Sequence, residues 1–113
     1  PERLQVWIRS YNAGILALRA NNTDEALKQF ESATQVYDKR AGAHLNLAQI
    51  YARQRQNDKA IGAYKAALAI LTKPENRAGL KPEEEAQAKQ FEEDATFNMA
   101  QLLAATSSVP NSV

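Results

Sequence analysis

The chain has 113 residues, of which 44% are hydrophobic and 24% charged, so it can form one packed domain and wholesale disorder is not expected. Its formal net charge is +1 and it has no basic stripe with interleaved aromatic residues, so neither feature predicts nucleic-acid binding. Cysteine is absent, which excludes disulfides, thiolate nucleophiles and cysteine-ligated zinc. No apolar run approaches the ~18 residues of a membrane span, so membrane insertion is not expected.

The sequence predicts helix nearly everywhere, because no segment alternates polar and apolar residues as a strand does. Thr23 is expected to be the N-cap of the second helix, and Asn57 the N-cap of the fourth. The first four helices are predicted over residues 4–20, 24–37, 41–55 and 58–71.

Residues 73–82 interrupt this pattern with two prolines and a glycine, which predicts a solvated connecting loop. Pro82 suits the first turn of a further helix, and the three glutamates that follow it suit the positive end of that helix. This last helix is predicted to run to about Ala105, a length of ~35 Å, and residues 107–113 are expected to form a flexible tail.

The first two pairs of helices superimpose when the sequence is shifted by 34 residues. The small residues of this repeat mark points where helices cross closely, and the aromatic residue fills the wedge beside them. The matching positions are Asn12 with Asn46, Gly14 with Ala48, Arg19 with Arg53, Asp24 with Asp58, Ala26 with Ala60, Phe30 with Tyr64, and Ala33 with Ala67.

A partial third unit follows, because residues 97–104 repeat residues 45–52 with four of eight positions identical. The last helix therefore corresponds to the first helix of a third repeat whose second helix is missing. A terminal capping helix is the alternative interpretation.

The repeats resemble those of the tetratricopeptide repeat family, which carries a small–x3–aromatic–x2–small run in its second helix. Here the runs are Ala26-x3-Phe30-x2-Ala33 and Ala60-x3-Tyr64-x2-Ala67, and the resemblance covers about residues 4–72. The sequence departs from the family where Ser10, His44 and Thr96 replace a usual large aromatic, and where Asp38 and Thr72 replace a usual proline.

The resemblance implies an all-α fold, with antiparallel helical hairpins stacked as a short right-handed superhelix of about two and a half repeats. Residues 1–106 would form this single domain, with repeats at about 4–37 and 38–72 and a partial repeat at 83–105. The alternative is an ordinary helical bundle whose alanines repeat by chance.

In such an array the first helices of successive repeats line a concave groove. Three asparagines hold the same repeat position there, and an asparagine row resembles the ladder by which some family members hold extended peptides, since each amide offers both a donor and an acceptor. The alternative is that these asparagines satisfy backbone groups within the array. The candidate peptide-binding residues are Tyr11, Asn12, Ile15, Arg19, Leu45, Asn46, Gln49, Arg53, Phe97, Asn98 and Gln101.

No catalytic, cofactor-binding or metal-binding residues are predicted. His44 is the only histidine and no acid is placed to orient it beside Ser10, so a packing role is expected. The acidic runs at 83–85 and 92–94 lack the glycine of a calcium loop.

We therefore predict a non-catalytic module that binds a protein or peptide partner. The alternatives are a scaffold domain that self-associates through residues 83–105, or the substrate-recognition fragment of a larger enzyme.

Overall fold

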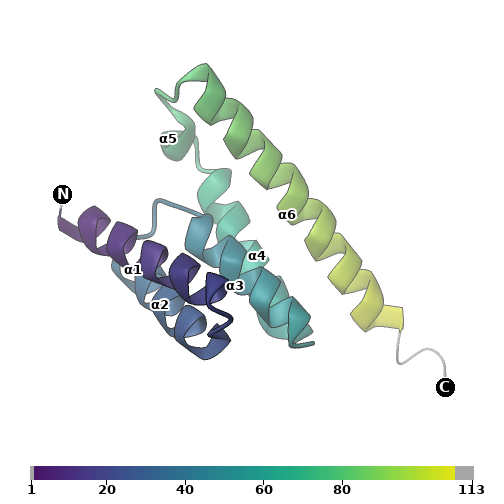
Figure 1. The fold of residues 1–113 in the computed structure, drawn as a ribbon. Helices are drawn as coiled ribbons and strands as arrows, with labels where there is room; N and C mark the ends of the chain where they lie inside the picture. Colours follow the sequence, from purple (N-terminus) through teal and green to yellow (C-terminus); the bar gives the residue numbers. More distant parts are fainter. Residues whose placement is uncertain (1, 109–113) are drawn as a thin grey trace.

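The computed structural model of the chain describes residues 2–108, and within that range the fold is all-α with no strand, as predicted. Four long helices form two hairpins, a one-turn helix follows, and the longest helix lies along the far side of the second hairpin (Figure 1). The helices are α1 (Glu2–Arg19), α2 (Thr23–Val36), α3 (Gly42–Arg53), α4 (Asn57–Leu71), α5 (Pro74–Arg77) and α6 (Pro82–Ser108).

The two hairpins turn in the same way, at positions 34 residues apart. Asn21 and Arg55 both adopt a positive φ, of 60° and 62°. Directly after them, the Asn22 amide donates to the Ala17 carbonyl at 2.8 Å, and the Gln56 amide donates to the Tyr51 carbonyl at 2.9 Å. These bonds satisfy carbonyls that a helix end would otherwise leave unpaired, so the sequence repeat is also a structural repeat.

The predicted N-caps were each wrong by one residue. Asn22, not Thr23, caps α2, because its side chain accepts from the Glu25 amide at 3.3 Å. Asn57 is already the first residue of α4, and Gln56 holds the N-cap position without a side-chain bond. The residue with positive φ in each turn, Asn21 or Arg55, reverses the chain tightly, and the next helix starts one residue before its predicted first residue.

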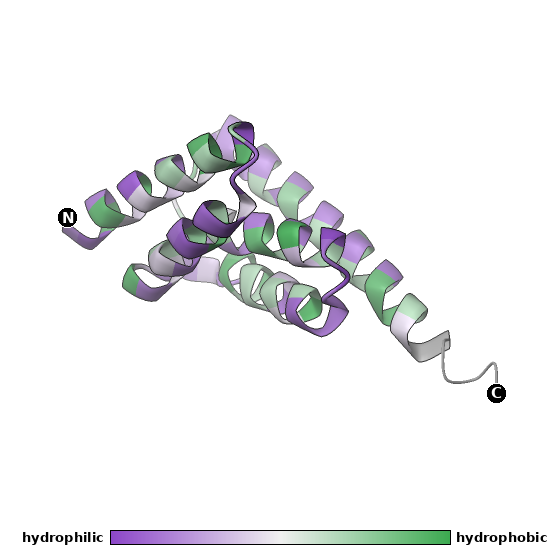
Figure 2. Cartoon of the chain, turned by 60° about the horizontal axis from the view of Figure 1, so that its bottom comes forward, coloured by the Kyte–Doolittle hydropathy of each residue, from purple (hydrophilic) through white to green (hydrophobic). Residues whose placement is uncertain are grey.

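The small and aromatic residues of the repeat form the core. Phe30 is fully buried over Gly14, and Tyr64 occupies the matching place in the second hairpin. The four alanines of the two runs, Ala26, Ala33, Ala60 and Ala67, are completely buried. The turns within the two hairpins are hydrophilic, whereas the hydrophobic residues lie in the helices (Figure 2).

The segment between α4 and α6 was predicted to be a solvated loop, and this was wrong for Arg77. Its guanidinium donates to the Leu71 carbonyl at 2.9 Å, and it also forms ion pairs with Glu85 and Glu92 of α6. The segment includes the single turn α5, which begins at Pro74, where a missing N–H is tolerated. Arg77 thereby ties the end of α4 to the first half of α6.

The last helix, α6, packs against α4 through Ala88 and Ala95. It packs against the helix that precedes it in the hairpin array, as α3 packs against α2. It extends to Ser108, beyond the predicted end at Ala105, so Ser107 and Ser108 are helical rather than part of a tail. The remainder of the predicted tail, residues 109–113, lies outside the described residues.

None of the helices described between residues 2 and 108 combines the length and the apolar character needed to cross a membrane.

Candidate functional site

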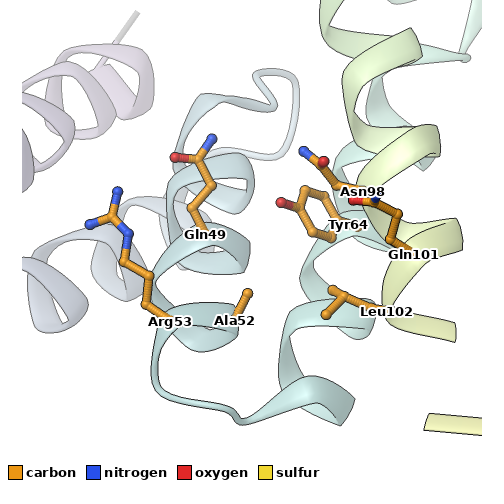
Figure 3. Close-up of a pocket in the computed structure, with 7 residues that line it drawn as sticks. All are labelled: Gln49, Ala52, Arg53, Tyr64, Asn98, Gln101 and Leu102. Atoms are coloured by element: carbon orange, nitrogen blue, oxygen red, sulfur yellow. The ribbon is translucent and has the colours of Figure 1, made fainter. Parts of the chain in front are cut away.

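A groove opens between α3 and α6, with α4 behind it. It consists of two adjacent hollows of about 330 and 210 Å³ that share Gln49, Tyr64 and Asn98, and we call it the α3–α6 groove. The larger hollow is lined by Gln49, Ala52, Arg53, Tyr64, Asn98, Gln101 and Leu102 (Figure 3). The smaller one extends past Leu45 and Asn46 to Tyr11 on one side, and to Phe91 and Asp94 on the other.

The helical periodicity places the polar side chains on facing walls. Gln49 and Arg53 are four residues apart on α3, and Asn98 and Gln101 are three apart on α6, so each pair projects from one face of its helix. Figure 3 shows Tyr64 of α4 between these walls, with its hydroxyl directed into the space between them. The groove therefore has amide-bearing walls and an aromatic floor.

Tyr11 and Asn46 form a hydrogen-bonded pair at the end of the smaller hollow. The Asn46 Nδ2 atom donates to the Tyr11 hydroxyl at 3.3 Å and to the Gly42 carbonyl at 3.0 Å. Both N–H groups of the Asn46 amide are thus used within the domain, and Oδ1 is its remaining hydrogen-bonding atom. The Tyr11 hydroxyl accepts in this pair, so its own proton is left to donate.

Tyr64 and Asn98 both line the two hollows, on the side of the groove opposite α3. Burial raises the pKa of the Tyr64 hydroxyl, and a hydrogen bond with the Asn98 side chain offsets part of this rise.

The predicted residues are only partly brought together. Those in the groove are Tyr11, Leu45, Asn46, Gln49, Arg53, Asn98 and Gln101. Four others, Asn12, Ile15, Arg19 and Phe97, line neither of its two hollows. Asn12 instead borders a separate hollow beside Trp7 and α5, and Phe97 is 63% exposed.

Seven groove residues were not in the predicted set, and they are Gly42, Ala52, Tyr64, Phe91, Asp94, Ala95 and Leu102. Tyr64 was predicted only as a packing wedge, but the sequence did contain a signal, because the matching Phe30 has no hydroxyl. Phe91 and Leu102 lie on the face of α6 toward α4 and the groove, which the sequence did not indicate, because the way α6 crosses α4 sets their position.

The single histidine is part of the packing of α3. Burial lowers the pKa of the half-buried His44 imidazole below its usual value of 6.5. The imidazole is therefore mostly neutral at pH 7, in keeping with the packing role expected of it.

A family model described as tetratricopeptide repeat matches residues 11–73, which is more than half of the chain. The matched span holds both small–x3–aromatic–x2–small runs and most of the two hairpins, whereas α6 lies beyond it. No curated protein and no solved structure matched the chain.

Proposed function

Because the chain belongs to the tetratricopeptide repeat family, whose members are generally non-catalytic modules for protein interaction, we propose that its α3–α6 groove binds an extended segment of a partner protein. The observation that carries this proposal is the convergence of Gln49, Tyr64 and Asn98 in one continuous groove. These three side chains come from three different helices, and each bears a hydrogen-bonding group.

The spacing of the groove side chains suits an extended backbone. Residues four apart on a helix, such as Gln49 and Arg53, are separated by about 6 Å along its axis. Two residues of an extended chain span about 6.6 Å, and alternate N–H and C=O groups point to the same side. Gln49 and Gln101 are exposed, so their amides can pair with a peptide backbone whatever its side chains are.

The pair of Tyr11 and Asn46 refines the predicted asparagine ladder. Asn46 has used both of its N–H groups on Tyr11 and Gly42, so it would accept from a peptide N–H through Oδ1. The hydroxyl of Tyr11 would donate to a peptide carbonyl, because Asn46 already donates to it. Leu45, Phe91 and Leu102 offer apolar contacts to the side chains of the bound segment.

The test is a random-peptide display screen on the domain, with the selected peptides titrated against the wild-type protein and a Gln49→Ala/Gln101→Ala double variant. These two glutamines are chosen because they are exposed, whereas Asn46 also holds Tyr11 in place. Each lost hydrogen bond is expected to weaken binding by about 0.5–1.5 kcal/mol, so the double variant should bind roughly 5- to 100-fold more weakly.

The matched control is Gln35→Ala, an exposed glutamine on α2 outside the groove, which should bind the same peptides as the wild type. The proposal fails if no peptide is selected, or if the double variant binds as tightly as the control.

A further inference from the structure

The second half of α6 is apolar on two sides. One side packs on α4 through Ala95, which is 1% exposed, while Phe97 is 63% and Leu103 44% exposed. At 100° per residue, the exposed residues Thr96, Phe97, Ala100 and Leu103 fall within roughly one third of the circumference, centred on Ala100. We call these four residues the outer stripe.

The first two repeats show what this side of a first helix is built to contact. Ala100 aligns with Gly14 and Ala48, which are both buried, and Gly14 lies beneath Phe30 of the following helix. Phe30 covers Gly14 so closely that an added Cβ would lie 2.6 Å from its ring. Ala100 is exposed, because no helix among residues 2–108 follows α6 to cover it.

The charges of α6 are all on its first half, within residues 83–94, where six acidic residues accompany Lys89. Residues 95–106 contain no charged side chain. The one polar group of the outer stripe, the Thr96 hydroxyl, already donates to the Glu92 carbonyl at 2.8 Å. Burying the outer stripe would therefore remove apolar surface from water without leaving a buried charge unpaired or a hydrogen-bond donor unsatisfied within the stripe.

We propose that the outer stripe binds the outer stripe of a second copy of this chain, with the two α6 helices antiparallel and crossing at Ala100. A two-fold axis there sets Ala100 against Ala100, so that the helices approach closely. Residues at equal distances on either side of the crossing then meet, which places Phe97 of each copy against Leu103 of the other. The large and small side chains of the stripe are arranged symmetrically for this contact.

Charge selects the antiparallel arrangement. Parallel helices would set the acidic first half of α6 beside the acidic first half of the other copy, and like charges would repel. Antiparallel helices send the two acidic halves in opposite directions from the crossing. This proposal gives a role to Phe97, which lines neither hollow of the α3–α6 groove.

The groove stays open in this dimer. By the helical periodicity, the groove residues Gln101 and Asn98 lie about 100° and 160° around α6 from Ala100, so both fall outside the third of the circumference that the outer stripe occupies. The inference does not depend on the proposed peptide binding.

The test is the mass of the protein in solution as its concentration rises, measured by sedimentation equilibrium. The wild type should shift from 12.5 kDa toward twice that mass. Ala100→Glu and Ala100→Lys should each weaken self-association at least about ten-fold, because like charges would meet on the two-fold axis. An equimolar mixture of the two variants should dimerise again, since opposite charges then meet.

The control is Ala86→Glu, which adds the same charge to an exposed alanine of the acidic half of α6, well away from the crossing. Thermal unfolding of each variant checks that the fold is kept. The proposal is overturned if the wild type stays at 12.5 kDa at its highest soluble concentration. It is also overturned if Ala100→Glu associates like the wild type, if Ala86→Glu weakens association equally, or if the mixed variants stay monomeric.

Discussion

The ring of Phe30 covers Gly14 so closely that a Cβ atom on Gly14 would lie 2.6 Å from Cε1 of that ring. Phe30 is fully buried, so its ring has little room to move away. Gly14→Ala should therefore lower the free energy of unfolding by roughly 1–2 kcal/mol, since overpacking costs more than the added helix propensity returns. Urea denaturation of the two proteins measures this difference.

Gly62 provides the matched control, because it also lies within a helix but an added Cβ would meet nothing within 4 Å. Gly62→Ala should raise the free energy of unfolding by about 0.5–1 kcal/mol through helix propensity alone. If both substitutions stabilise the protein, the close contact between Gly14 and Phe30 does not restrict the core.

Arg77 is predicted to hold the first half of α6 against the rest of the domain. Arg77→Ala removes the ion pairs to Glu85 and Glu92 and the bond to the Leu71 carbonyl. Amide hydrogen exchange in residues 83–94 should then accelerate, while exchange in α1 should not change. Lys73→Ala, which removes an exposed charge from the same connecting segment, should leave both rates unaltered.

The ion pair between Arg77 and Glu85 should make the stability of α6 depend on pH. The Arg77 guanidinium, chiefly by hydrogen bonding, lowers the pKa of the Glu85 carboxyl below its usual 4.5. Because the folded pKa is the lower one, the stabilisation is present above about pH 4.5 and is lost as the pH falls through the folded value. The acid-induced loss of protection in α6 should be smaller in Arg77→Ala, and equal losses in the two proteins would contradict the prediction.

The Tyr51 hydroxyl is predicted to ionise at a higher pH than an ordinary tyrosine. Burial, together with the hydrogen bond that its hydroxyl donates to Glu31 at 2.8 Å, raises the pKa of Tyr51 to about 12. Since the folded pKa exceeds the unfolded value of 10.0, this contribution to stability is present below pH 10 and is lost as the pH rises toward 12. Ultraviolet titration of the wild type and Tyr51→Phe isolates this tyrosine among the four.

Glu31→Gln tests the cause of the shift. It should lower the pKa of Tyr51 only in part, because burial is the larger cause and remains. A pKa that returns fully to 10.0 would mean that Glu31, not burial, dominates.

The helices and the hairpin repeat were predictable because they depend on local features. Ala26, Phe30 and their counterparts recur at a fixed period, and the turns fall at small or polar residues, so sequence alone indicated the all-α family fold. The role of Arg77 was not predictable, since its partners lie eight and fifteen residues away and meet it only once α6 is docked.

The candidate site was predicted less completely, for a geometric reason. Helical spacing identifies which residues share a face, but the groove depends on how successive repeats turn relative to one another. That turn brings Asn46 and Asn98 to one groove and leaves Asn12 outside it. The bond from Asn46 to Tyr11 joins two repeats, so no pattern within one repeat could have indicated it.

If the α3–α6 groove binds a peptide as proposed, the peptide should lie in it in one fixed direction. Arg53 borders only the larger hollow and Asp94 only the smaller one, so the two ends of the groove carry opposite charges. Selected peptides should therefore carry an acidic residue near Arg53 and a basic residue near Asp94, in a fixed order. Arg53→Glu should replace the acidic preference by a basic one and leave the preference near Asp94 unchanged.

The expected change in peptide affinity is small, because water weakens exposed ion pairs to about 0.2–1 kcal/mol each. A peptide selected on the wild type should bind Arg53→Glu a few-fold more weakly at low ionic strength, and added salt should narrow the difference by screening. Arg9→Glu makes the same charge change on an exposed residue of α1 outside the groove and should select the wild-type consensus. If the wild type, Arg53→Glu and Arg9→Glu all select peptides with no preference for charge at either end, that result would be compatible with binding in the groove, but it would contradict a fixed direction.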